Sequence, residues 1–330
     1  MVSDTQIRKG VVEMSESKYG KYIVTELKKD LVLPWGPPGE VREEYVPGRN
    51  RPLEHVLWLD SEIAPGCFYS ECVWFFPFGE ISPEELERMR KEGGGPQPHT
   101  HPSAELFTFF GTNFDDPHDL GGEVEFWLED QPFVFSKSCL VYIPAGMKHS
   151  PVRFRRMDKP IFHFSLIPTQ AYEHSIPDES GEYAGQDLSK YFVFQDKPNL
   201  KLPEYRHDIP KEAAHRVVYL DSEVVPGANV YAEAVWFWPG KRRPPQPGDE
   251  PGVKPHTHPF SEMIGFFGTD ENDIHDLCGE VELWIDGEQH IMDKSFVACI
   301  PAGLEHCPLN IRRIDRPIFH FTAGPGKMYE

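Results

Sequence analysis

The sequence predicts an all-β protein made of two jelly-roll barrels in tandem, with short peripheral helices. The segment Pro98–Glu105 recurs as Pro255–Glu262, and each matching residue is displaced by the same interval, 256 − 99 = 157. The segment Ile143–His149 recurs as Ile300–His306 at that interval, 306 − 149 = 157. The stretches around these motifs are short, rich in β-branched and aromatic residues and separated by Gly and Pro, which is typical of strands in a barrel.

Length and charge limit the class of protein. A chain of 330 residues is long enough for two domains that each bury a core, and its hydrophobic content of 39% excludes a disordered chain. No apolar run reaches the twenty or so residues of a membrane span. The net charge of −20 argues against nucleic acid and anionic membranes as partners. We therefore expect a small-molecule substrate and leave a homo-oligomer open.

The N-terminus and the cysteines bear on the compartment. The first residues lack the charged and then apolar pattern of a secretory signal, so we expect a cytoplasmic protein. The six cysteines form no CxxC pair and mostly lie in apolar surroundings. We expect them to be buried, reduced thiols rather than a disulfide framework.

Pro- and Gly-rich segments and the internal repeat mark the boundaries between four parts of the chain. Residues 1–50 are rich in Pro and Gly towards their end and predict an arm that wraps the barrels or a subunit partner. Residues 51–168 form the first predicted barrel, 169–215 a connector without a strong period, and 216–330 the second barrel.

The strands that precede the first motif also occur twice. Val56–Glu62 matches Val217–Glu223, and Phe68–Pro77 matches Val230–Pro239 with a displacement of 236 − 74 = 162. The loop that enters the first motif is therefore five residues longer in the first barrel, since 162 − 157 = 5. Within it, Ser82–Gly93 has a capping serine, a proline in the first turn and terminal glycines, which predicts a short helix. This helix is either a lid over the first site or a plain surface helix.

An apolar strand follows each first motif. On these strands the residues that share parity with the motif's glutamate should line the barrel interior, because side chains alternate between the two faces of a strand. We expect a dry, bulky substrate pocket there, lined by Phe107, Phe109, Ile264 and Phe266, with Tyr69 and Tyr231 from the preceding strands.

The two repeated motifs together predict metal sites. In an extended segment His99 and His101 point to the same side, and Glu105 joins them if Pro102 bends the strand. The Pro and Gly of the second motif predict a tight turn, after which its histidine folds back as a fourth donor. Three imidazoles and a carboxylate suit a divalent transition metal, and manganese, iron, nickel, cobalt and zinc all accept such ligands.

The HxHxxxE and PxGxxH motifs resemble the two-motif signature of the cupins, and two copies resemble a bicupin. The resemblance covers roughly residues 55–168 and 217–325. It implies one metal ion inside each barrel, held by His99, His101, Glu105 and His149 in the first and by His256, His258, Glu262 and His306 in the second. Unlike the usual pattern, a longer loop follows Gly111-Thr112 and Gly268-Thr269, which leaves the subfamily open.

Other repeated polar residues are candidates for catalysis. Glu71 and Glu233 lie on a strand that leads to the metal motifs, where they are either proton-transfer groups or surface acids paired with arginine. His118 and His275 recur in the longer loop, and they either act in catalysis or belong to a loop whose turn Asp119 or Asp276 caps. His163 and His320, on the closing strands, are expected to support the ligands or fill the core.

The resemblance implies a fold more firmly than a reaction, because cupins include dioxygenases, decarboxylases, isomerases and non-catalytic binders. The aromatic pocket favours a dioxygenase acting on a phenolic or enolic compound. The alternatives are a non-redox isomerase, hydrolase or decarboxylase, and a metal-stabilised binding protein without turnover. The basic, proline-rich loop Lys241–Gly248 would supply positive charge for an acidic substrate.

Overall fold

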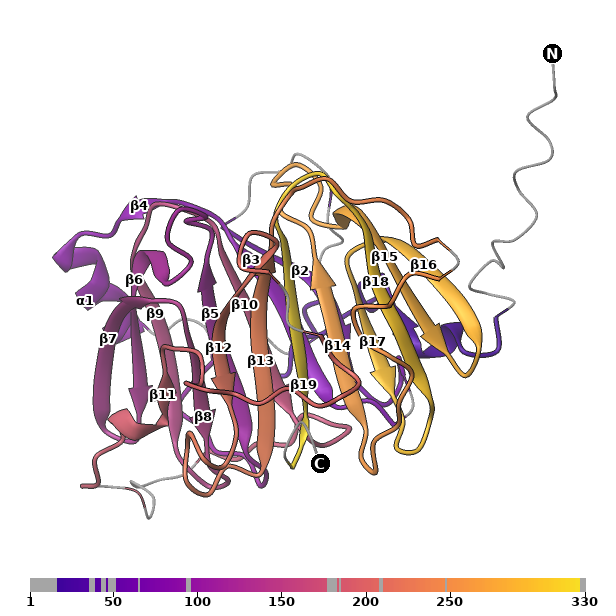
Figure 1. Cartoon of the computed structure of the whole chain (residues 1–330). Helices are drawn as coiled ribbons and strands as arrows, with labels where there is room; N and C mark the ends of the chain where they lie inside the picture. The colour runs from indigo at the N-terminus through magenta and orange to yellow at the C-terminus, as the bar shows by residue number, and fades with distance from the viewer. Residues whose placement is uncertain are drawn as a thin grey trace.

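The computed structural model describes residues 17–326 except 36–38, 43–45, 47–51, 65, 93–95, 177–182, 184, 208–209 and 247. These residues form two units that stand side by side, each made of a larger and a smaller β-sheet (Figure 1). The prediction of an all-β fold is confirmed, since α1 (Pro83–Glu92) is the one α-helix in the described part of the chain. No helix there is both long enough and apolar enough to span a bilayer.

Both units repeat one sheet topology. In the first unit, the larger sheet has the order β11 (Phe192–Val193), β8 (Cys139–Ile143), β5 (Glu105–Gly111), β10 (Ile161–Ile167), β3 (Tyr69–Phe75) and β2 (Leu53–Leu59), and the smaller has β4 (Gly79–Glu80), β9 (His149–Met157), β6 (Asp119–Leu128) and β7 (Gln131–Lys137). In the second unit, the larger sheet has the order β1 (Ile23–Val24), β17 (Phe296–Ile300), β14 (Glu262–Phe267), β19 (Ile318–Pro325), β13 (Val230–Phe237) and β12 (Ala214–Leu220), and the smaller has β16 (Glu288–Lys294), β15 (Asp276–Ile285) and β18 (His306–Ile314). Neighbouring strands are antiparallel.

The helix predicted between the first strands and the first motif is present as α1. The backbone N–H of Glu85 donates to Oγ of Ser82 at 3.1 Å, which is the expected N-cap. The helix follows β4, which pairs with β9 at Arg156 and Met157, the end of β9 opposite His149. A role for α1 as a lid over the first site stays a prediction.

The two larger sheets bury both of their faces. Their inner faces pack against the smaller sheets, as where the rings of Phe107 and Phe126 stack at 5.1 Å. Their outer faces pack against each other between the units, where Phe164 stacks on Phe321 with ring centroids 4.1 Å apart. These strands are therefore apolar on both sides rather than alternating, as expected of a sheet covered on both faces.

Two short segments are exchanged between the units. Strand β1, from the N-terminal arm, pairs with β17 of the second unit, whereas β11, from the connector, pairs with β8 of the first unit. These strands lie in similar sequences, Lys21-Tyr22-Ile23-Val24 and Lys190-Tyr191-Phe192-Val193, at an interval of 190 − 21 = 169. That interval differs from the 157 of the metal motifs, so the connector seemed featureless in the sequence. Each unit thus completes one sheet with a strand from outside its own core.

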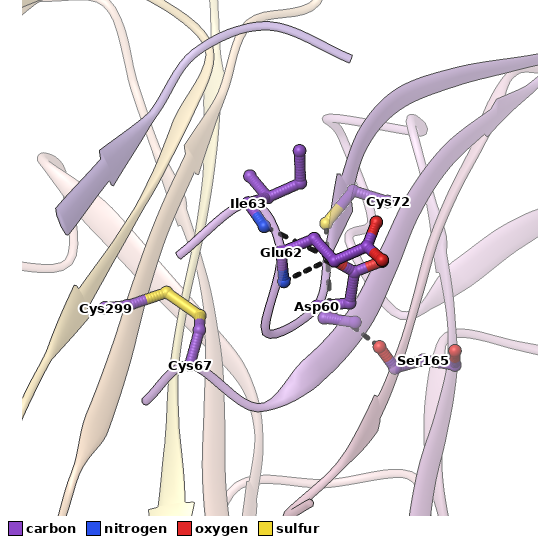
Figure 2. Close-up of a disulfide and its surroundings, with 8 residues drawn as sticks. Asp60, Glu62, Ile63, Cys67, Cys72, Ser165 and Cys299 are labelled. Carbon is purple, nitrogen blue, oxygen red and sulfur yellow. Dashed lines mark hydrogen bonds between the residues drawn. A yellow bond between two sulfur atoms is a disulfide. The ribbon is translucent and has the colours of Figure 1, made fainter. Parts of the chain in front are cut away.

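A disulfide between Cys67 and Cys299 links the units, and Figure 2 shows it joining a loop of the first unit to a strand of the second. The expectation that every cysteine is a reduced thiol is wrong for this pair. The outer-face packing of the larger sheets brings their Cα atoms to 5.4 Å, although 232 residues separate them in sequence. The other cysteines are free and buried: Cys72, Cys139, Cys278 and Cys307. Disulfides are characteristic of oxidising compartments, and the cytoplasmic location stays a prediction.

Candidate metal centres

Strand pairing brings each HxH segment beside the histidine of the second motif. His99 and His149 form an isolated bridge in which each backbone N–H donates to the other residue's carbonyl, at 3.1 and 3.0 Å. His256 and His306 form the same bridge, at 3.1 and 3.0 Å. The glutamate of each first motif opens the adjacent strand, β5 or β14. The four predicted ligands of each unit therefore meet at one end of the sheets.

The turn of the second motif is fixed to the first motif. Gly146 has a φ of +77° and Gly303 a φ of +78°, a conformation that favours glycine. The N–H of Gly146 donates to the carbonyl of His101 at 2.8 Å, and that of Gly303 donates to the carbonyl of His258 at 2.8 Å. The PxGxxH spacing thus positions the turn on the HxH segment, so that the last histidine points inward.

The first centre presents three imidazole nitrogens to one point. The ligand atoms of His99, His101 and His149 lie within 4.8 Å of one another, and all three residues are buried. Their Nδ1 atoms lie 2.6, 2.6 and 3.1 Å from backbone carbonyl oxygens, so each Nδ1 carries the proton and donates it. The lone pairs on the Nε2 atoms therefore face the centre, which is the tautomer that a metal ligand requires.

Glu105 completes this centre from one side. Its Oε2 lies 2.9 Å from Nε2 of His149 and 3.4 Å from Nε2 of His101. All three atoms are buried and without a hydrogen-bond partner among the described residues, and all three are acceptors in the tautomers given above. Acceptors at these distances require a shared cation, either a proton or a metal ion. The residues therefore fit a divalent metal ion.

The second centre has the same donors and a further hydrogen bond. The ligand atoms of His256, His258, Glu262 and His306 all lie within 4.8 Å of one another. Oε2 of Glu262 is 3.1 Å from Nε2 of His306, while its Oε1 accepts a hydrogen bond from the hydroxyl of Tyr231 at 2.8 Å. Tyr231 therefore orients the carboxylate.

Burial and charge shift the pKa values in both centres. Burial, with the neighbouring His149 or His306, lowers the pKa of His99 and of His256 to about 4. Burial alone would raise the pKa of Glu262, but the imidazole of His306, 3.1 Å from its carboxylate, and the adjacent His258 lower it to about 2. The pKa of Glu105 is likewise held far below its usual range. The carboxylates are therefore ionised near neutral pH.

A cavity of about 580 Å³ opens onto the second centre. Of the expected pocket residues, Ile264 and Phe266 line it, and Phe237 and Tyr205 add aromatic surface. Phe107 and Phe109 instead pack against the ring of His163 in the first unit, at 4.4 and 5.5 Å, and Tyr69 packs against Tyr172 at 5.0 Å.

Three arginines line this cavity, and two have acidic partners. Arg206 contacts Glu233 at 2.5 Å, and Arg243 contacts Asp249 at 2.6 Å. Arg242 donates from Nη2 to the carbonyl of Ala213 at 3.2 Å, and its Nε is buried without a hydrogen-bond partner among the described residues. The predicted basic loop therefore places the guanidinium of Arg242 in the cavity, where its Nε can still donate a hydrogen bond to a ligand.

The two repeated glutamates are buried in different surroundings. Glu71 lies between His55, 3.3 Å from its carboxylate, and His163, at 3.8 Å. Glu233 has 0% exposure and lies between Arg206 and Arg216. The alternative prediction for Glu233 is a surface acid paired with arginine. Its arginine partners are present, but the residue lies inside the protein and not at the surface.

The structure does not bring His118 or His275 to a metal centre. Both follow the far ends of β5 and β14, roughly 20 Å of strand away from the glutamates. Oδ1 of Asp119 accepts the N–H of Gly121 at 3.0 Å, and Oδ1 of Asp276 accepts that of Cys278 at 2.8 Å. These contacts match the alternative interpretation, in which the repeat preserves a capped turn.

The connector contributes residues that the sequence did not point to. Oη of Tyr172 lies 3.0 Å from Nε2 of His99, and the carbonyl of Glu173 accepts the Nδ1 proton of His101. In the second unit, the ring of Tyr205 stacks on His256 with centroids 4.0 Å apart. One signal was available for the first pair, because Tyr172-Glu173 recurs as Tyr329-Glu330, 329 − 172 = 157 residues later.

No family model matches the sequence, and no curated protein matches it. The chain is similar to the Bacillus subtilis oxalate decarboxylase of a study of Mn(II) centres, with TM-score 0.46 and 14% identity over 82% of this chain and 73% of that chain. It is similar to Lactobacillus farciminis oxalate decarboxylase in a formate complex, with TM-score 0.46 and 15% identity over 84% and 82%. For AerE from Microcystis aeruginosa the TM-score is 0.43 and the identity 13%, over 86% and 97%. The function is therefore argued from the geometry of the two centres.

Proposed function

We propose that this chain is a metal-dependent enzyme of the bicupin type, with one divalent transition metal ion in each unit, that transforms a small oxygenated carboxylate at the second centre. One observation carries the proposal: four metal-ligand side chains line the same cavity of about 580 Å³ as Arg242, which has no acidic partner among the described residues. A bound metal ion would supply Lewis acidity towards a substrate oxygen. Manganese, iron, cobalt, nickel and zinc all suit the donor set.

The charge of Arg242 supports an anionic substrate. Burial lowers the pKa of Arg242, but a guanidinium stays protonated at physiological pH. Its buried Nε has no partner among the described residues, and a substrate carboxylate would satisfy it with a charge-assisted hydrogen bond. The substrate would then lie between Arg242 and the imidazoles of His256, His258 and His306.

The polar residues deep in the cavity favour a non-redox reaction. Nε2 of His320 lies 3.1 Å from the hydroxyl of Thr322, and both residues line the cavity. Burial lowers the pKa of His320 to about 4, so the imidazole is neutral near physiological pH. Its Nδ1 donates to the carbonyl of Gly265, and its Nε2 can accept a hydrogen bond from the hydroxyl of Thr322. Glu233 is fixed by two arginines and is a poor proton carrier. We therefore place decarboxylation, isomerisation or ring opening first, with His320 and Thr322 handling the proton.

The second candidate is the dioxygenase acting on a phenolic or enolic compound. The aromatic part of the cavity lining, formed by Tyr205, Phe237 and Phe266, favours it, because a planar ring packs well on such surfaces. A metal-stabilised binding protein without turnover is the third reading, and it predicts ligand binding with no product.

Turnover with and without oxygen separates these candidates. Metal content of the purified protein is measured first, followed by product formation from small keto, hydroxy and dicarboxylic acids and from phenolic compounds, in air and under anaerobic conditions. The proposal expects turnover of a carboxylate that persists without oxygen and whose KM rises at least tenfold in R242Q. K241Q is the matched control, because Lys241 is exposed on the same loop and is not among the residues that line the cavity, so its loss should change KM little. Oxygen-dependent turnover of phenols would select the second candidate instead.

A further inference from the structure

Tyr172 is held against the first centre by the backbone that directly follows it. Thr100, between the two histidines of the first motif, pairs with Ser175 through reciprocal N–H···O bonds of 2.9 and 3.0 Å. The carbonyl of Glu173 accepts the Nδ1 proton of His101 at 2.6 Å. The segment after β10 therefore lies along the HxH segment, and Tyr172 enters the site from it.

Aromatic packing fixes the ring of Tyr172. Its centroid lies 5.0 Å from that of Tyr69 and 5.3 Å from that of Trp35. The ring of His101 meets it edge to face at 4.9 Å. These contacts leave the hydroxyl oxygen 3.0 Å from Nε2 of His99, where it donates to the lone pair that faces the centre.

This position matches a coordination site. Ligand atoms about 2.1 Å from one metal ion and at right angles to each other are about 3.0 Å apart. Glu105 and His149 meet this condition at 2.9 Å, and so do Tyr172 and His99 at 3.0 Å. Glu105 approaches from the side of His101 and His149, whereas Tyr172 approaches from the side of His99.

We propose that Tyr172 is a fifth protein ligand of the metal ion in the first centre, joining His99, His101, His149 and Glu105. The inference rests on the proposed metal binding and deepens it, because a centre closed by a phenol oxygen has fewer positions for substrate. It differs in this from the second centre, which opens onto the cavity. Tyr172-Glu173 also recurs at the 157-residue interval of the ligands, although Tyr329 and Glu330 lie outside the described residues.

Tyr205 provides the matched control. Its ring stacks face to face on His256, with centroids 4.0 Å apart and planes 13° apart. A tyrosine stacked in this way offers its face rather than its hydroxyl to the ligand imidazole. With the second centre disabled, Y205F should therefore leave iron binding at the first centre unchanged, whereas Y172F should remove one ligand there.

The test uses the full chain with the second centre disabled by H258A and H306A, loaded with iron and oxidised in air. A phenolate bound to ferric iron gives a visible charge-transfer band, and excitation in that band enhances phenolate vibrations in the resonance Raman spectrum. We expect the band in this background and in Y205F, and its loss in Y172F with about one iron still bound per chain.

Two results would overturn the inference. Iron bound without a phenolate band, or a band that survives in Y172F, would show that Tyr172 does not coordinate and only hydrogen-bonds to His99. Absence of bound iron would refute the proposed metal binding itself, so the two failures are distinct. If Y172F does not fold, ring-deuterated tyrosine in the background protein still tests the proposal, because enhanced vibrations that do not shift would show that no tyrosine, and so not Tyr172, is bound.

Discussion

Arg216 places its Nε 2.9 Å from Oε2 of Glu233, in the interior of the second unit. Strand register makes His55 the counterpart of Arg216 in the first unit, where it faces Glu71. Two related sites therefore place different side chains, a guanidinium and an imidazole, against the same buried carboxylate. A guanidinium keeps its charge when its partner is removed, whereas an imidazole can release its proton.

E233Q should be far more destabilising than E71Q. Removing Glu233 takes the buried carboxylate partner away from both Arg206 and Arg216, which stay charged, and this costs about 3–5 kcal/mol. Removing Glu71 leaves two imidazoles that can be neutral, and the loss should be about 1–3 kcal/mol. Urea unfolding at pH 7 measures both values. Equal losses in the two variants would contradict this account of the cations.

Acid should act on the same carboxylate. Burial raises the pKa of Glu233, but Arg206 and Arg216 outweigh burial and lower it below the ordinary 4.5. The unfolded state therefore binds the proton first, so the stabilisation is fully present above about pH 4.5 and is lost as the pH falls through the folded pKa. Between pH 5 and pH 3 the unfolding free energy of wild type should fall more steeply than that of E233Q. Parallel pH profiles would contradict the assignment.

Loss of the disulfide between Cys67 and Cys299 should lower stability without changing metal content. The bond closes a loop with a sequence separation of 232 residues, and a cross-link of that length stabilises by about 2–5 kcal/mol through the unfolded chain. C67S/C299S should unfold at lower urea than the oxidised wild type, and a reductant should bring wild type to the level of the variant. Alkylation of six thiols in the unfolded, unreduced protein, rather than four, would refute the bond.

Each centre should lose its own metal ion when one of its histidines is removed. Wild type should bind about two metal ions per chain, H101A and H258A about one each, and the double variant close to none, measured by inductively coupled plasma mass spectrometry. H118A and H275A are the controls, because these histidines lie beyond the far ends of β5 and β14. Full metal content in the double variant would refute the ligand assignment.

Gly268 should not tolerate a side chain. A Cβ there would overlap the backbone oxygen of Asp276 and lie 2.6 Å from the carbonyl carbon of Leu277, and backbone atoms cannot rotate away. G268A should therefore cost about 1–3 kcal/mol or more by overpacking. G240A is the control, since nothing lies within 4 Å of its Cβ position and its effect should be small. Thermal unfolding compares the two.

The residues of the site that the sequence predicted are those placed by short-range patterns along the chain. Parity along an extended segment places His99 and His101 together, and the turn at Gly146 returns His149 to them, so spacing alone identifies these residues. Tyr172 and Arg206 come from the connector, whose approach to the centres depends on contacts between residues distant in sequence, such as Thr100 with Ser175. The disulfide joins residues that no local pattern relates.

The internal repeat identified candidate residues, but it could not distinguish metal ligands from residues that only stabilise a turn. His118 and His275 recur as faithfully as the ligands, yet the contacts of Asp119 and Asp276 show that a turn is what the repeat preserves there. The strands β1 and β11 recur at another interval, and their exchange became visible only in the sheet order.

That exchange makes the two halves of the chain interdependent. A polypeptide cut in the connector before β11 would leave β17 without β1 if the N-terminal piece were lost, and β8 without β11 if the C-terminal piece were lost. Either fragment alone would present a bare sheet edge, which is a template for aggregation. When the fragments are mixed, each supplies the strand that the other lacks. The two halves of the chain therefore resemble two subunits that exchange edge strands and are joined by the connector.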